Sequence, residues 1–139
     1  MKSNLAEPRK PRRWGFWNRH VIHDGRTIYL DRLSIVTTPL FSIKLHRIYR
    51  RDQQRDLHDH PWDFLSIVLW GSYVEDTPTG LKKRRWWNRK RAADRHSIRE
   101  VSRRPVWTLV VTGPKRREWG VWTSTGWIPW HRYEKLNEA

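Results

Sequence analysis

The chain has 139 residues, no cysteine and a formal net charge of +15 at pH 7. This length fits one domain, and the 11 tryptophans supply enough apolar area for one compact core. The lack of cysteine excludes disulfides, thiolate metal sites, iron–sulfur clusters and cysteine nucleophiles, so any metal ion would be held by nitrogen and oxygen. No apolar run is long enough to cross a membrane, and no apolar segment follows the basic N-terminus as in a signal peptide. We therefore expect a cytoplasmic protein without a membrane partner.

Short β-segments dominate the pattern along the chain. Residues 1–24 are predicted to be a basic N-terminal arm, residues 25–134 a β-barrel, and residues 135–139 a C-terminal tail. Within the barrel, β-rich or alternating segments are expected at residues 27–30, 33–38, 41–49, 58–69, 72–75, 96–101 and 106–112. Many short strands with turn signals between them indicate an all-β, antiparallel barrel or sandwich.

The segment at residues 41–49 alternates most clearly. Phe41, Ile43 and Leu45 share one face, and the other face is polar and carries His46, a secondary candidate for the mouth of the barrel.

The strongest local motif is His58-Asp59-His60, followed by an apolar strand and Gly71. Because alternate side chains of a strand point the same way, His58 and His60 are expected to reach one metal ion, while Asp59 points away or fixes a ring tautomer. A His-x-His pair arises by chance in roughly one such chain in three, so the pair alone is weak evidence. His96, at the start of a later β-segment, is the third candidate ligand.

This pattern resembles the cupin superfamily, whose first motif is His-x-His, a spacer, an acidic residue, an apolar strand and a glycine. The resemblance covers roughly residues 41–112 and implies a small double-stranded β-helix of the jelly-roll type. The stretch from Trp107 to Pro114, and the residues around Trp119 and Trp127, are also similar to cupin-like proteins of bacteria and their phages.

The resemblance is incomplete at the acidic position. Phe64 stands where cupins usually have glutamate, and Asp63 lies one residue earlier. The variant resembles the three-histidine cupins, of which the thiol dioxygenases are the best-known class. Asp63 becomes a metal ligand if a bulge at Pro61 shifts the register. Whether Asp63 or Glu75 completes the coordination shell stays open at this point.

The resemblance favours a metal-dependent enzyme of the dioxygenase type. It favours Fe(II), with Zn, Ni, Mn and Cu as the alternatives that nitrogen ligands accept. The abundance of arginine points to a small anionic substrate, for which Arg117 is a candidate clamp. Tyr73, just after Gly71, is a candidate hydrogen-bond donor to a metal-bound group. Cupins often pair through their outer strands, which makes a homodimer an implication of the resemblance.

Two other functions remain open. Residues 82–91 interleave seven lysines and arginines with Trp86 and Trp87, a pattern typical of nucleic-acid binding, in which cations meet phosphates and rings stack on bases. The other alternative is a cupin that binds a ligand without chemistry.

Overall fold

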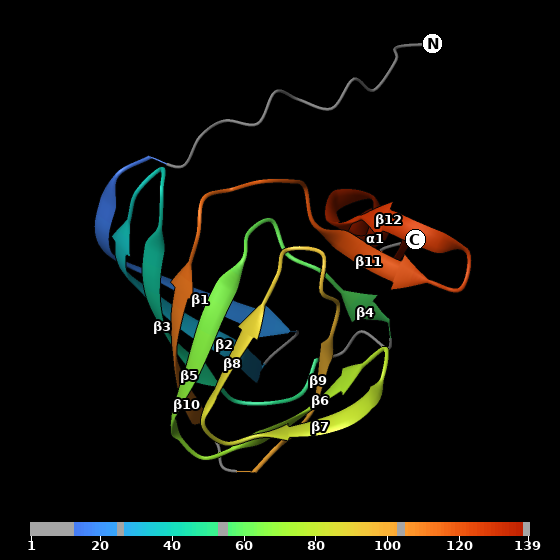
Figure 1. The fold of residues 1–139 in the computed structure, drawn as a ribbon, viewed down its shortest axis with the longest axis horizontal. Helices are drawn as coiled ribbons and strands as arrows, with labels where there is room; N and C mark the ends of the chain where they lie inside the picture. Colours follow the sequence, from blue (N-terminus) through green and yellow to red (C-terminus); the bar gives the residue numbers. More distant parts are fainter. Residues whose placement is uncertain (1–12, 25–26, 53–55, 103–104, 138–139) are drawn as a thin grey trace.

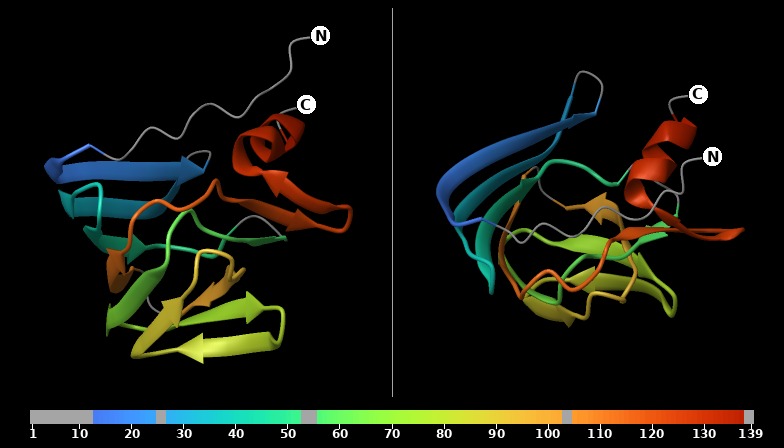
Figure 2. Two further views of the ribbon diagram at one scale, coloured as in Figure 1. Left: turned by 45° about the horizontal axis from the view of Figure 1, so that its top comes forward. Right: turned by 90° about the horizontal axis from the view of Figure 1, so that it is seen from above.

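Two layers of antiparallel strands form the body of the protein. The computed structural model describes residues 13–24, 27–52, 56–102 and 105–137. One layer is a six-stranded sheet in the order β1-β2-β3-β10-β5-β8. Its strands are β1 (Gly15–Asp24), β2 (Thr27–Thr37), β3 (Ser42–Ile48), β10 (Val106–Thr112), β5 (Phe64–Trp70) and β8 (Trp87–Lys90). Figures 1 and 2 show this curved sheet forming one wall of the barrel.

The opposite wall consists of two three-stranded sheets. One has the order β7-β6-β9 and the other β12-β11-β4. Their strands are β7 (Gly80–Arg84), β6 (Tyr73–Thr77), β9 (Ser97–Val101), β12 (Gly126–Pro129), β11 (Gly120–Thr123) and β4 (Leu57–His58). An antiparallel bridge between His58 and His96 joins the two sheets at their seam. The all-β jelly-roll prediction is therefore confirmed.

Both ends of the described chain contain more regular structure than the sequence predicts. Residues 15–24, assigned above to the arm, form β1 and pair along their length with β2. The other predicted arm residues lie largely outside the described part of the chain. After β12, residues Trp130–Asn137 form the helix α1, which takes in the start of the predicted C-terminal tail. Among the described residues, no helix is long and apolar enough to cross a membrane.

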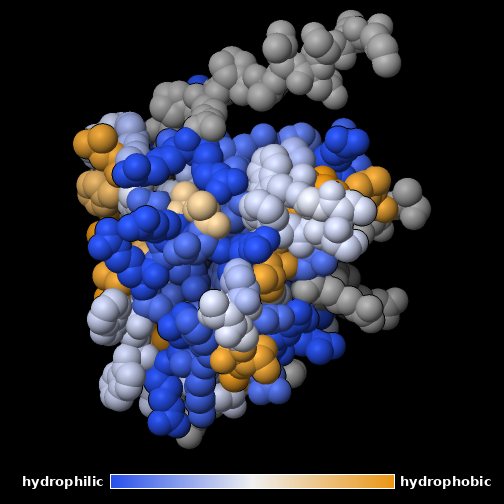
Figure 3. All heavy atoms as spheres, turned by 45° about the vertical axis from the view of Figure 1, so that its right-hand side comes forward, coloured by the Kyte–Doolittle hydropathy of each residue, from blue (hydrophilic) through white to orange (hydrophobic). Residues whose placement is uncertain are grey.

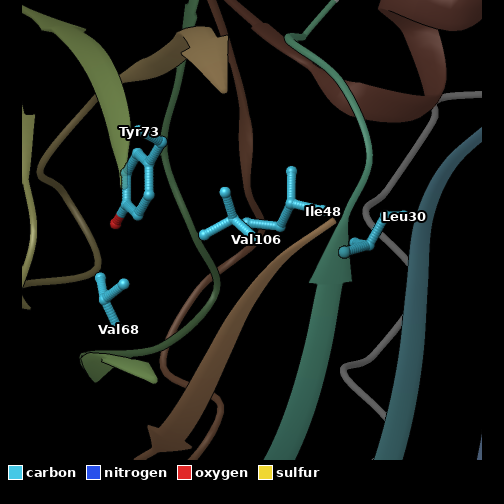
Figure 4. Packing of buried hydrophobic residues seen from close by; sticks show 5 residues of the cluster. All are labelled: Leu30, Ile48, Val68, Tyr73 and Val106. Atoms are coloured by element: carbon cyan, nitrogen blue, oxygen red, sulfur yellow. The ribbon is translucent and has the colours of Figure 1, made fainter. Parts of the chain in front are cut away.

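The apolar core is small and sits at one end of the barrel. Figure 4 shows its five buried side chains, which come from five different strands: Leu30, Ile48, Val68, Tyr73 and Val106. Each of these strands thus contributes one side chain to the cluster. Ala92, Val110 and Val121 are also buried but lie outside this cluster, and the rest of the interior is built from other residues.

Those other inward positions are largely polar. Ser42, Lys44 and Ile48 are the buried positions of β3, so the face that carries His46 turns inward. Ile43 and Leu45, on the apolar face, are only partly buried. The predicted alternation of β3 is present, but its polar face, not its apolar face, lines the barrel. On the outside, Figure 3 shows one side of the molecule as mainly hydrophilic, with scattered hydrophobic residues.

We expect truncation of the core to lower stability sharply. Ile48, 6% exposed, packs within the buried cluster, so Ile48→Ala removes buried methylene groups and leaves a cavity. The expected loss in the free energy of unfolding is about 2–5 kcal/mol. Leu136→Ala, at a 58% exposed position of α1, is the control and should change stability by less than ~0.5 kcal/mol. Denaturant unfolding measures both; equal effects would contradict this assignment of the core.

Candidate metal centre

Three histidines meet where the two small sheets join. Their ligand nitrogens all lie within 4.8 Å of one another. His58 ends β4, His60 lies two residues further on, and His96 directly precedes β9. The structure thus brings together the three histidines that the sequence proposed as ligands.

Main-chain hydrogen bonds fix the relative positions of these residues. The amides of His58 and His96 each donate to the other's carbonyl at 2.9 Å, and the amide of His60 donates to the carbonyl of Ala92 at 3.0 Å. Because every histidine is held through its own backbone, the ring positions do not depend on loop conformation alone.

The spacing of the rings suits a single metal ion. The Nε2 atoms of His60 and His96 are 3.4 Å apart, and the three ring centroids are 4.9–5.2 Å apart. Two nitrogens bound to one tetrahedral ion at ~2.1 Å lie about 3.4 Å from each other. The donor set is three imidazole nitrogens, which accommodates Fe, Ni, Cu and Zn alike.

A buried carboxylate orients His96. Oε2 of Glu75 lies 2.6 Å from Nδ1 of His96, and the Glu75 side chain is fully buried. When the His96 ring is neutral and its Nδ1 donates to Glu75, Nε2 carries the lone pair that faces the other two rings. This is the carboxylate–histidine pairing that sets ligand tautomer and basicity in many metal sites. Glu75 therefore contacts a candidate ligand, His96, on the side away from the converging nitrogens.

Two cations neutralise Glu75. Arg84 Nε and Lys90 Nζ donate to its Oε1 at 2.6 and 2.9 Å. Burial disfavours the charged carboxylate, but the hydrogen bonds from His96 and Lys90 outweigh burial and lower the pKa of Glu75 from 4.5 to about 2. Glu75 is thus ionised at neutral pH, as a hydrogen-bond acceptor for His96 must be.

The other two rings are neutral at physiological pH. Burial, followed by the charge of His96, lowers the pKa of His58 from 6.5 to about 3. The same causes hold the pKa of His60 well below 6.5. Nδ1 of His60 is buried without a hydrogen-bond partner among the described residues. Neutral imidazoles with available lone pairs are the form that metal ions bind, so the three residues fit a divalent cation.

Asp59, between the two histidines of the motif, points away from them as expected. It is fully buried and accepts four hydrogen bonds. The donors are the amide of Gly120, the guanidinium of Arg117 and the indoles of Trp122 and Trp127, at 2.7–3.1 Å. Asp59 therefore attaches the β11–β12 hairpin to the metal-binding motif.

Gly120 has to approach this motif closely. A Cβ atom at this position would lie 2.3 Å from the carbonyl oxygen of Ile128 and 2.6 Å from the ring of Trp127. Only glycine therefore fits between Asp59 and the β12 strand.

The remaining predicted site residues have other partners. Arg117 donates to Asp59 at 2.9 Å, which gives it a structural contact behind the motif. Tyr73 lies in the apolar core, where its hydroxyl accepts from Nδ2 of Asn88 at 3.0 Å and burial raises its pKa. Oδ1 of Asp63 accepts from the amide of Ala92 at 2.8 Å. None of these three belongs to the converging group of ligand atoms, which contains only histidines among the described residues.

Sequence reasoning missed several residues around the centre. The sequence places Lys90 and Arg84 in the basic run at residues 82–91, but in the structure both donate to the buried Glu75. Asp52 lies between the predicted β-segments at residues 41–49 and 58–69. It accepts from the amide of Ile98 at 2.7 Å, and its Oδ2 lies 3.9 Å from Nδ1 of His58. No local signal in the sequence distinguishes Lys90 from the other cations of this run; its burial is seen only in the structure of β8.

Solved structures of other proteins have a similar fold. A cupin-2 domain protein from Rhodospirillum rubrum matches 94% of this chain and 87% of its own, with a TM-score of 0.63 and 9% identity. The polyketide cyclase RemF from Streptomyces resistomycificus matches 86% of this chain and 87% of its own, with a TM-score of 0.62 and 12% identity. The protein therefore has the cupin fold, which confirms the resemblance seen in the sequence.

A third similar structure is described as Fe(II) HppE. The match covers 68% of this chain and 56% of that one, with a TM-score of 0.54 and 11% identity. No protein-family model matches the sequence, and no curated protein matches it. At these identities the comparisons establish the fold, and the site has to be interpreted from its own residues.

We expect Asp59 to be essential for stability. Asp59→Ala leaves the Arg117 guanidinium and two indole N–H groups without their acceptor, so the free energy of unfolding should fall by roughly 3–5 kcal/mol. Asp94→Ala, at an exposed position, is the control for loss of one carboxylate. Thermal and denaturant unfolding give the comparison; an Asp59→Ala protein as stable as the control would show that this carboxylate does not hold the hairpin.

Proposed function

We propose that this protein is a metal-dependent enzyme of the cupin fold, an Fe(II) oxygenase acting on a small anionic substrate. The main observation behind the proposal is the convergence of His58, His60 and His96, with the first two rings neutral and no carboxylate among the converging atoms of the described residues. Three imidazole ligands, which bind metal ions in their neutral form, would leave the full charge of a divalent ion in place, with coordination positions open to other molecules. Bound Fe(II) would supply activation of dioxygen beside the substrate.

Fe(II) is favoured over Zn(II) by two considerations. Imidazole ligands accept both ions, so ligand type leaves the choice open. The resemblance to three-histidine cupins and the similarity to the structure described as Fe(II) HppE both favour iron. The residues of this chain that would hold the ion are the three histidines, with Glu75 setting the tautomer of His96.

The inner face of the large sheet supports an anionic substrate. Arg32, His46 and Thr108 are register neighbours across β2, β3 and β10. Arg32 donates to Nε2 of His46 at 3.1 Å, and burial alone lowers the pKa of Arg32. No carboxylate is paired with Arg32 in the described ranges. A partly buried cation without a paired anion is costly, and a bound carboxylate or phosphate would offset that cost.

Two further inward groups add to this environment. Lys44, 7% exposed, adjoins His46 on β3, and its charge helps to lower the pKa of His46. The hydroxyl of Thr108, 1% exposed, has no hydrogen-bond partner within the described part of the chain. A cation with a nearby hydroxyl is a common combination for binding an anionic group.

We expect the histidines to be required for metal retention. Protein reconstituted anaerobically with Fe(II) should hold about one ion per chain by elemental analysis, and His58→Ala should hold far less because one of three ligands is gone. His23→Ala removes an exposed histidine of β1 and should retain the metal. Equal metal contents in the two variants, or no metal in the wild-type protein, would overturn the assignment of this centre.

We expect Arg32 to select the substrate through its charge. Oxygen uptake by the Fe(II)-loaded protein is measured with a panel of small carboxylates and phosphate esters. Arg32→Met should raise KM for an anionic substrate roughly 10- to 100-fold, because a charged hydrogen bond is lost. The same variant should be at least as stable as the wild type, because a desolvated charge is removed.

The exposed Arg132→Met of α1 is the control for Arg32→Met and should leave KM unchanged. Metal binding without oxygen uptake on any member of the panel would contradict the oxygenase and favour a ligand-binding cupin. Uptake with an unchanged KM in Arg32→Met would contradict the role of Arg32.

A further inference from the structure

A hollow of about 430 Å³ lies between the last residues of β7 and the start of β8. Its lining is Lys83, Arg84, Arg85, Trp86 and Trp87. β7 is the edge strand of one small sheet, and β8 is the edge strand of the large sheet. The hollow therefore lies where the two walls of the barrel meet, at the β7–β8 connection visible in Figure 1.

The aromatic rings at this place are unusually exposed. Trp86 and Trp87 are 77% and 68% exposed. Leu69 and Trp70, at the end of the neighbouring strand β5, are also exposed. Adjacent large rings left in water are typical of a surface that a partner covers.

The outward face of β8 carries a ring followed by a cation. Trp87 and Arg89 are exposed, whereas Asn88 and Lys90 between and after them are buried. Strand geometry thus places a ring and a guanidinium on the same outward face. Lys83 and Arg85 add charge beside the rings, and within the described ranges neither they nor Arg89 forms an ion pair.

The occupant has to supply negative charge and flat faces together. A second copy of this chain carries a net charge of +15 and would bring repulsion to a cationic surface. A lipid headgroup supplies phosphate but no planar ring. A single nucleic-acid strand supplies both, with phosphates for the cations and unpaired bases to stack on indoles.

We infer that this hollow and the outward face of β8 bind single-stranded nucleic acid. The binding surface is separate from the metal centre, because the side chains of Trp87 and Arg89 leave the barrel while Lys90 enters it. Arg84 lines the hollow but is already bound to Glu75, so the charge offered to a phosphate comes mainly from Lys83, Arg85 and Arg89.

Two pairs of variants test the inference in the full chain. The double variants Lys83→Glu/Arg85→Glu and Arg132→Glu/Lys135→Glu change the net charge equally, but the second lies on exposed positions of α1. The variants Trp86→Ala/Trp87→Ala and Trp14→Ala/Phe16→Ala each remove two exposed rings, the second pair at β1, the opposite edge of the large sheet. Circular dichroism verifies that each variant is folded.

Binding is measured by fluorescence anisotropy of a dye-labelled thymidine oligonucleotide over a range of salt concentrations. Trp86→Ala/Trp87→Ala should weaken binding roughly 10- to 100-fold, through loss of stacking. Lys83→Glu/Arg85→Glu should weaken binding and reduce the slope of log affinity against log salt by about 1.4, the value for two lost phosphate contacts on a single strand. The α1 and β1 variants should bind like the wild type.

Two results would overturn the inference. One is no binding of the oligonucleotide by the wild-type protein, whether or not it binds phosphatidylserine vesicles; the other is equal losses in the charge variants of the hollow and of α1. His58→Ala should bind the oligonucleotide normally. Failure of the metal centre and failure of this surface are therefore distinguishable.

Discussion

The reciprocal backbone hydrogen bonds between His58 and His96 are the constraint on which the centre depends. They join two three-stranded sheets that share no other strand pairing among the described residues, and so complete the second wall of the barrel. The residues that make this bridge are also two of the three candidate ligands. Closure of the barrel and assembly of the metal centre are therefore one structural event, because the amides that pair the sheets belong to the residues whose rings converge.

Two fully buried carboxylates hold this seam from opposite sides. Asp59 accepts four hydrogen bonds from the β11–β12 side, and Glu75 accepts from His96 and two cations on the β6–β8 side. A buried carboxylate is tolerated only when its hydrogen-bonding capacity is filled, and both residues meet that requirement. These hydrogen bonds offset the cost of burial and also fix the orientation of the candidate ligand residues that the carboxylates adjoin. This explains why a small domain places two of its carboxylates in the interior.

The interior of the barrel is divided between stability and function. The apolar cluster occupies one end, whereas Arg32, Lys44 and His46 line the large sheet beyond it. A uniformly apolar interior would be more stable, since desolvating cations is unfavourable. The polar lining therefore points to a ligand that compensates the charge, in agreement with the proposed anionic substrate. On the outside, the hollow lined by residues 83–87 is a second cationic surface. It differs from the interior because the rings of Trp86 and Trp87 are exposed to water.

The sequence by itself determined the local features: strand alternation, the His58–Asp59–His60 motif and the all-β class. These depend on neighbours within a few residues, because strand geometry repeats every two positions. The family resemblance added His96 as the third candidate ligand. Only the tertiary structure decided that the polar face of β3 turns inward, that Glu75 orients His96 and that Arg117 binds Asp59. The last two are contacts between residues far apart in the sequence, by 21 positions for Glu75–His96 and by 58 for Asp59–Arg117. No local periodicity encodes such contacts.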